Sequence, residues 1–305
     1  AIPLIEKLIS IDPSDDDFIF RIALLCFDNE RYNLSEKYFN ILLSKFYVPD
    51  NINFFLGQID YKNKRYDEAL LHYQRIQQGT FVNVKTLNVS KALLKKYNLE
   101  KALSHIDKEI KIKNQDNLLN SLSLKLSIFE EIGESADIIR LSSQILESFP
   151  NNERALYSRA LAYEKEGNIL SMSKDFDEMI KLNKYNSIAL NAYGYSLALH
   201  KLHLDKSEKL IRKALEIRPG EAAILDSLAW VLYLKGSYKE AAKYSSLAYS
   251  KDQDPEIIEH HYLILLKNGN SNEAKSILDQ SIKNNPNSEK LLKLLDSSEN
   301  AAIKL

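Results

Sequence analysis

The chain has 305 residues, of which 45% are apolar and 27% are charged, a composition typical of a globular protein. Its 41 lysines and arginines and 42 acidic residues leave a formal net charge of -1, so no global field attracts nucleic acid or an anionic membrane. Eight glycines, seven prolines and a single cysteine, Cys26, exclude a turn-rich β protein, a collagen and a disulfide-stapled fold.

Two interleaved series of residues mark the whole chain at a period of about 34 residues. The first series marks the ends of successive segments: Pro13, Pro49, Asn83, Asp116, Pro150, Lys184, Pro219, Gln253 and Pro286. The second series lies in the middle of the segments: Asn29, Asn63, Asn98, Gly133, Gly167, Lys201, Gly236 and Gly269. Because Asn and Gly tolerate the left-handed conformation that ends a helix, the second series predicts helix C-caps. Each segment is therefore predicted to hold two helices.

Several helix starts are predicted from local signals. Capping boxes are expected at Asn33 with Glu36, Ser237 with Glu240 and Asn270 with Glu273. Asp254 followed by Pro255 is expected to be an N-cap with proline at the first helical position. Each predicted helix has about a dozen residues, too few to persist alone, so its stability has to come from packing against neighbouring helices.

This helix–turn–helix period resembles the tetratricopeptide repeat (TPR), with its W-x2-L-G-x2-Y, A-x3-F and P pattern. Small residues stand at the glycine position of the first helix: Gly57, Ala160, Gly194 and Ala229. Alanine opens the second helix at Ala69, Ala102, Ala241 and Ala274. The tryptophan of the first motif position is absent, and Lys184 and Gln253 replace the terminal proline. The resemblance implies an all-α fold, a right-handed superhelical solenoid of about eight repeats.

In chain order, the sequence divides into a partial repeat or helix over 1–13, four divergent repeats over 14–150, four clear repeats over 151–286 and a C-terminal cap helix over 287–305. The cap is expected because a terminal repeat would otherwise expose its apolar side.

The sequence carries no catalytic or cofactor signature. The G-x-S-x-G, P-loop, G-x-G-x-x-G, HExxH and CxxC patterns are all absent. His200 and His203 have only Asp205 nearby as a third ligand, and we interpret them as surface side chains and not as a metal site. We therefore expect no enzymatic activity, no cofactor and no metal.

Two further histidines and the cysteine are interpreted as structural. His260 and His261 are adjacent, which sends them to different sides of a helix, so one is expected at a packing interface and the other in solvent. Cys26 lies in the apolar run 22–27 and is expected to be buried and inert. That run is among the longest apolar stretches, far short of the roughly 18 to 20 residues of a membrane-spanning helix. Lysine clusters are interleaved with acids, which predicts no nucleic-acid binding.

The TPR resemblance implies that the first helix of each repeat lines a concave groove for a peptide or a partner helix. Positions three before, one after and four after the small residue are expected to face it. These candidate partner-binding residues are Phe54, Gln58, Tyr61, Tyr157, Asn191, Tyr195, Asp226, Trp230 and Tyr233, with Leu161, Glu164 and Leu199 at the remaining positions.

Trp230, the single tryptophan, is the leading candidate because Asp226 and Tyr233 share its helix face. For each aromatic residue the alternative is packing between repeats. The expected wall is aromatic and slightly acidic, which favours a basic or apolar segment over an acidic tail.

A closer resemblance involves four blocks: 191–198, 213–219, 223–233 and 254–257. Together they are similar to the C-terminal repeats of proteobacterial TPR lipoproteins on the periplasmic side of the outer membrane. Some members act as adaptors that bind a carboxyl-terminal processing protease and present substrates such as cell-wall hydrolases. Ala229, where that family is expected to have glycine, and the segment 260–266 depart from the pattern.

The resemblance implies a non-catalytic adaptor that contacts the membrane only through a lipid anchor not present in this chain. The chain begins at Ala1 without an initiator methionine, as expected if a signal segment or a tag was removed. Two alternatives stay open. One is a cytoplasmic assembly or export scaffold, and the other is an unrecognised hydrolase or the non-catalytic TPR arm of a larger enzyme such as a glycosyltransferase.

Overall fold

A computed structural model describes residues 15–79 and 81–302 of the chain, and none of these residues lies in a strand. Within them the chain forms seventeen helices, α2 to α18. The chain divides into two compact units, Ala1–Phe149 and Pro150–Leu305. The element expected over 1–13 and the last three residues of the expected cap lie outside the described residues.

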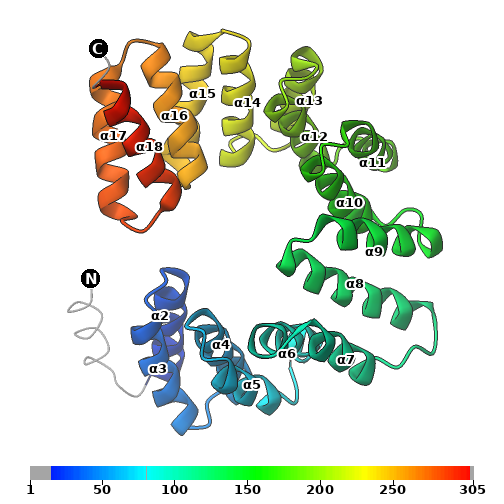
Figure 1. Ribbon diagram of the computed structural model, residues 1–305. Helices are drawn as coiled ribbons and strands as arrows, with labels where there is room; N and C mark the ends of the chain where they lie inside the picture. The colour runs from blue at the N-terminus through cyan, green and yellow to red at the C-terminus, as the bar shows by residue number, and fades with distance from the viewer. Residues whose placement is uncertain (1–14, 80, 303–305) are drawn as a thin grey trace. The chain divides into compact units, whose positions relative to one another are not determined.

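The first unit is built of helix pairs in which each helix packs on the next along the chain (Figure 1). Its helices are α2 (Asp16–Asp28), α3 (Tyr32–Ser44), α4 (Pro49–Lys62), α5 (Tyr66–Arg75), α6 (Val82–Lys96), α7 (Leu99–Glu109), α8 (Gln115–Ile132) and α9 (Ser135–Ser148). Phe39, Leu42 and Ile52 are completely buried where the first pair meets α4. These helices form four successive pairs, α2 with α3, α4 with α5, α6 with α7 and α8 with α9.

The second unit repeats the same arrangement and ends on a single helix (Figure 1). Its helices are α10 (Glu153–Lys165), α11 (Ile169–Leu182), α12 (Ser187–Leu199), α13 (Leu204–Ile217), α14 (Ala222–Leu234), α15 (Tyr238–Lys251), α16 (Pro255–Lys267), α17 (Ser271–Asn284) and α18 (Glu289–Ala302). α18 contacts both α16 and α17, and its Leu291 is fully buried against them. The predicted all-α solenoid of paired helices is therefore confirmed within each unit.

The two helices of a repeat approach closely at two of the predicted small residues, Gly57 and Gly194. A Cβ atom on Gly57 would lie 2.5 Å from the ring of Tyr73, and one on Gly194 would lie 2.6 Å from Ile211 Cγ1. The close approach lets Ser207 Oγ donate a hydrogen bond of 2.6 Å to the carbonyl oxygen of Gly194. A side chain at this position would have to separate the helices, which is why it is small.

The left-handed residues that follow the first helices confirm most of the predicted helix ends. Gly133, Gly167, Gly236 and Gly269 have φ between +71° and +82°, and Lys201 has φ +53°. In the first two repeats the left-handed residue is Glu30 or Lys64, one position after the predicted Asn29 or Asn63. The prediction for Asn98 is wrong: it is the N-cap of α7, and its side chain accepts a hydrogen bond from the backbone N–H of Lys101.

Of the predicted capping boxes, those at Ser237 and Asn270 are right about the helix start, because these are the N-cap residues of α15 and α17, but the hydrogen bonds of the box do not form. Asn33 lies inside α3, and the side chains of Ser237 and Asn270 accept no hydrogen bond from the helices that they precede. A capping box needs the backbone N–H of its N-cap residue, but Ser237 and Asn270 donate theirs to carbonyl oxygens of the preceding helix, at 2.9 Å and 3.0 Å. The predicted N-cap Asp254 with Pro255 at the first helical position is confirmed.

Candidate partner-binding site

The candidate residues lie on the first helices of their repeats, as predicted. α4 carries Phe54, Gln58 and Tyr61, α10 carries Tyr157, α12 carries Asn191 and Tyr195, and α14 carries Asp226, Trp230 and Tyr233. All are half-buried except Asp226, whose exposed fraction is 5%. Because α4 belongs to the first unit and the other three helices to the second, the two groups are described separately.

In the first unit, the α4 side chains contact other parts of the same unit. Phe54 stacks on Phe81 with ring centroids 3.9 Å apart. The hydroxyl of Tyr61 donates a hydrogen bond of 3.1 Å to Glu131 of α8, and Lys95 of α6 lies 3.0 Å from the same carboxylate. Burial raises the pKa of Tyr61. These contacts favour a packing role for Phe54 and Tyr61.

In the second unit, Tyr157 also faces the protein interior. Its ring packs edge-on against Phe176 of α11 at 6.2 Å, and Phe176 stacks on Tyr193 of α12. Burial raises the pKa of Tyr157. The remaining candidates of this unit, on α12 and α14, form a connected group with α16.

Asn191, Asp226 and His260 occupy equivalent positions of three successive repeats. α12 contacts α14, and α14 contacts α16. The imidazole Nδ1 of His260 lies 2.8 Å from Asp226 Oδ2 and donates a hydrogen bond to the carboxylate, with both side chains buried. This pair connects α14 to α16.

The prediction that one of the two adjacent histidines faces solvent is wrong, because His260 and His261 are 4% and 2% exposed. α16 packs against α14 on one side and α15 on another, so neighbouring positions on it both meet a helix. His261 Nδ1 lies 2.8 Å from Ser245 Oγ of α15, and its ring stacks on Tyr249. Burial lowers the pKa of His261.

Trp230 belongs to a stack of three rings. Its centroid lies 4.1 Å from that of His260 and 5.0 Å from that of Tyr233, with interplanar angles of 15° and 13°. The stack shows that Trp230 packs between repeats, while its half-buried state leaves part of the ring accessible. Its contact with a partner stays a prediction.

A hollow of about 360 Å³ lies beside this group, and we call it the acidic hollow. It is lined by Asn191 and Tyr195 of α12, Ala223, Asp226 and Ser227 of α14, and Asp252, Asp254, Glu256 and Ile257 around the start of α16. The hydroxyl of Tyr195 donates a hydrogen bond to Glu256. Asn191 Oδ1 and Asp226 Oδ1 are buried and have no hydrogen-bond partner among the described residues. Burial raises the pKa of the Asp226 carboxyl.

Sequence reasoning missed the contributions of α16 to this site. His260 lies one 34-residue period after Asp226, so extending the position rule to the eighth repeat would have found it. Asp254 and Glu256 stand at the start of a helix, where acids commonly cap the helix or interact with its dipole. Asp254 does accept a hydrogen bond of 2.8 Å from the backbone N–H of Glu256. Its second role in lining the hollow depends on the neighbouring helices.

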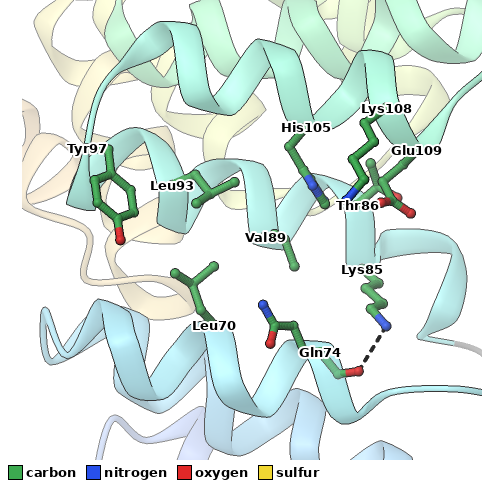
Figure 2. A pocket seen from close by; sticks show the side chains of 10 residues that line it. All are labelled: Leu70, Gln74, Lys85, Thr86, Val89, Leu93, Tyr97, His105, Lys108 and Glu109. Atoms are coloured by element: carbon green, nitrogen blue, oxygen red, sulfur yellow. Dashed lines mark hydrogen bonds between the residues drawn. The ribbon is translucent and has the colours of Figure 1, made fainter.

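Figure 2 shows a second hollow, of about 430 Å³, between α5, α6 and α7 of the first unit. Leu70, Val89 and Leu93 give it an apolar wall. The ammonium of Lys85 donates hydrogen bonds of 3.0 Å and 2.8 Å to backbone carbonyl oxygens of Gln74 and Ile76 at the end of α5. These bonds satisfy carbonyl groups at the end of α5 that have no partner within the helix.

The other chemical candidates occupy structural positions. His200 Nε2 lies 2.8 Å from Glu164 Oε1, and no group of three or more His, Cys, Asp or Glu within residues 15–79 and 81–302 is placed to hold a metal ion. Cys26 is 2% exposed, as predicted, and burial raises the pKa of its thiol. Over the same described ranges, no helix has the length and apolar character that crossing a membrane requires.

Comparisons with known proteins agree with this fold. Two family models described as tetratricopeptide repeat match the chain, one over residues 20–80 and the other over residues 263–288. The TPR repeat-containing protein PA4667 of Pseudomonas aeruginosa is 26% identical over 211 residues, which are 69% of this chain and 36% of that protein. The chain thus spans about a third of the length of this relative.

Two solved structures share the fold at low identity. A tetratricopeptide repeat protein from Parabacteroides merdae superposes with a TM-score of 0.58 at 16% identity, over 81% of this chain and 98% of that one. PilW, a widely conserved type IV pilus biogenesis factor, gives a TM-score of 0.57 at 16% identity, over 71% of this chain and 100% of that one. Proteins built of such repeats generally act as non-catalytic scaffolds for protein interactions. The chain therefore contains tetratricopeptide repeats, matched at residues 20–80 and 263–288, and its helices pack as in solved structures of such proteins.

Proposed function

We propose that the chain holds a segment of a partner protein against α12, α14 and α16 of its second unit. The observation that carries this proposal is the acidic hollow beside a half-buried aromatic stack, both formed by first helices of consecutive repeats. Partly exposed rings next to polar groups are typical of protein-binding surfaces.

The chemistry of this surface favours a basic or apolar segment. Four carboxylates and no lysine or arginine are among the residues that line the hollow. An acidic tail would meet like charges there, whereas a basic segment would be attracted.

The finer proposal is an adaptor in a bacterial envelope, on the periplasmic side of the outer membrane. It is supported by the similarity of blocks within 191–257 to envelope TPR lipoproteins. The partner would be a carboxyl-terminal processing protease or a cell-wall enzyme, and the lipid anchor would come from outside this chain.

Photo-crosslinking from within the acidic hollow tests the scaffold. A photoreactive amino acid is placed at Ala223 of α14, which is exposed and lines the hollow, and for comparison at Leu247 of α15, which is 42% exposed. Crosslinked proteins from the source cells are identified by mass spectrometry, and each is then purified and titrated against the chain.

The scaffold predicts a protein that crosslinks from position 223 and not from position 247 and that binds saturably when purified. Equal crosslinking from both positions, or no saturable binding, would refute it. Cell fractionation then separates the finer proposals. A partner confined to the cytoplasm would refute the envelope adaptor while leaving the scaffold in place.

A further inference from the structure

The acidic hollow differs from the acidic pair on α13 of the same unit in how its charges are balanced. On α13, Asp205 and Glu208 both lie 2.6 Å from the ammonium of Lys235, so the acids there have a cation in contact. The residues that line the hollow include four carboxylates but no lysine or arginine. Of the four carboxylates, Glu256 is the one that the Lys290 ammonium approaches, and their distance is 4.0 Å. The same ammonium lies closer, at 3.0 Å, to Glu259, which does not line the hollow. The hollow therefore carries an excess of negative charge.

Two buried oxygen atoms lack a hydrogen bond in the same place. Asp226 is 5% exposed, and while its Oδ2 accepts from His260, its Oδ1 has no partner among the described residues. Asn191 Oδ1, from the equivalent position of the preceding repeat, is also buried without a partner. Burying an acceptor without a donor costs free energy, so a ligand that supplies N–H groups here would stabilise the site.

The pattern of acceptors suits an organic cation and not a metal ion. No three metal-binding side chains in the described parts of the chain converge closely enough to coordinate a metal. An arginine guanidinium carries five N–H donors in a planar fork, so it can bind separate acceptors at once, whereas the three donors of lysine radiate from one atom. The volume of about 360 Å³ falls within the roughly 300 to 1,000 Å³ of ligand sites.

We propose that the acidic hollow binds an arginine side chain of the partner protein. The guanidinium donates hydrogen bonds to Asp226 Oδ1 and Asn191 Oδ1, and its charge faces Glu256 and the two aspartates before α16. Trp230 and Tyr233 lie about one and two turns further along α14. The flanking part of the same segment would cross this aromatic stack. The inference rests on the proposed function, because the arginine belongs to the segment that the scaffold holds.

Short peptides provide the test. Acetylated and amidated Gly-Ser-Arg-Ser-Gly is titrated into the full chain by calorimetry, beside the same peptide with citrulline or lysine in place of arginine. Citrulline keeps the shape of arginine and removes its charge. We expect the citrulline peptide to bind at least about ten-fold more weakly, because charge-assisted hydrogen bonds are the stronger kind. The lysine peptide should lie between the two.

Variants locate the binding site. Asp226→Asn and Glu256→Gln preserve shape, and each should weaken the arginine peptide by about ten-fold. Glu216→Gln on α13 is the matched control, because Glu216 is exposed and does not line the hollow, and it should leave the affinity unchanged. Circular dichroism checks each fold. If the Asp226→Asn protein does not fold, the Glu256→Gln protein provides the test, because Glu256 is only half-buried and its substitution disturbs the fold less.

Equal affinity for the arginine and citrulline peptides would overturn the inference. So would a loss of affinity in the control Glu216→Gln as large as the loss in Glu256→Gln. That result leaves the scaffold intact if a purified partner still crosslinks from position 223 and binds saturably. Arginine selectivity that is lost in Glu256→Gln supports the assigned ligand chemistry. If no partner is then captured from position 223, the proposed function fails and the ligand chemistry stands.

Discussion

Replacing Gly194 of α12 with alanine should destabilise the protein, although alanine is the better helix former. The new methyl carbon would lie 2.6 Å from Ile211 Cγ1 and 2.9 Å from the backbone oxygen of Ser207. Carbon atoms in contact are normally about 3.5 to 4.0 Å apart. Ile211 is fully buried, and the backbone of Ser207 cannot rotate away, so α13 has to move by about 1 Å.

The two opposing contributions differ in size. Helix propensity favours alanine over glycine by about 1 kcal/mol. Overpacking a core costs about 1 to 3 kcal/mol, and displacing α13 endangers the buried hydrogen bond from Ser207 to Gly194, which contributes about 1 kcal/mol more. The expected net loss in the free energy of unfolding is therefore about 1 to 3 kcal/mol.

Urea denaturation followed by the fluorescence of Trp230, the single tryptophan, reports on the unit that contains the substitution. Ala192→Gly in the same helix is the control, and it should lose about 1 kcal/mol from helix propensity. A Gly194→Ala protein as stable as the parent, or more stable, would refute the close approach of α12 and α13.

Three further outcomes follow from the second unit. Trp230→Ala should weaken partner binding about ten-fold or more if the ring anchors a contact, whereas unchanged affinity with a lowered melting temperature would assign the ring to packing alone. A chain ending at Asn287 loses the buried Leu291 of α18, so it should melt earlier and aggregate by light scattering, and an equally stable, soluble chain would contradict the cap. Burial raises the pKa of Asp226 above its value in the unfolded chain, which is about 3.9, so the native state binds the proton more tightly. The contribution of this carboxyl to stability should therefore fall as the pH rises from about 4 through the native pKa. Asp226→Asn should remove that fall from urea midpoints measured across pH, and parallel curves for the two proteins would contradict the assignment.

The sequence predicted only part of the candidate site. The position rule selected Asn191, Tyr195 and Asp226, and the structure brings all three to the lining of one hollow. The same rule also selected Phe54 and Tyr157, whose rings pack inside their units. Helical periodicity gives the face of a helix but not the neighbour that meets it, so it could not separate these cases.

By itself, the sequence determined the repeat, the two helices in each repeat and the small residues where they touch. These features depend on side-chain size and on backbone conformation within a few residues, so they can be predicted from short stretches of the sequence. Only the tertiary structure decided that His260 and His261 are both buried and that the side chains of Ser237 and Asn270 accept no cap hydrogen bond. It also decided that Asn191 and Asp226 line one hollow, each with an oxygen atom that has no partner among the described residues. Each of these outcomes depends on which atoms of another helix lie nearby, because burial, hydrogen bonding and local charge are set by neighbours that are distant in the chain.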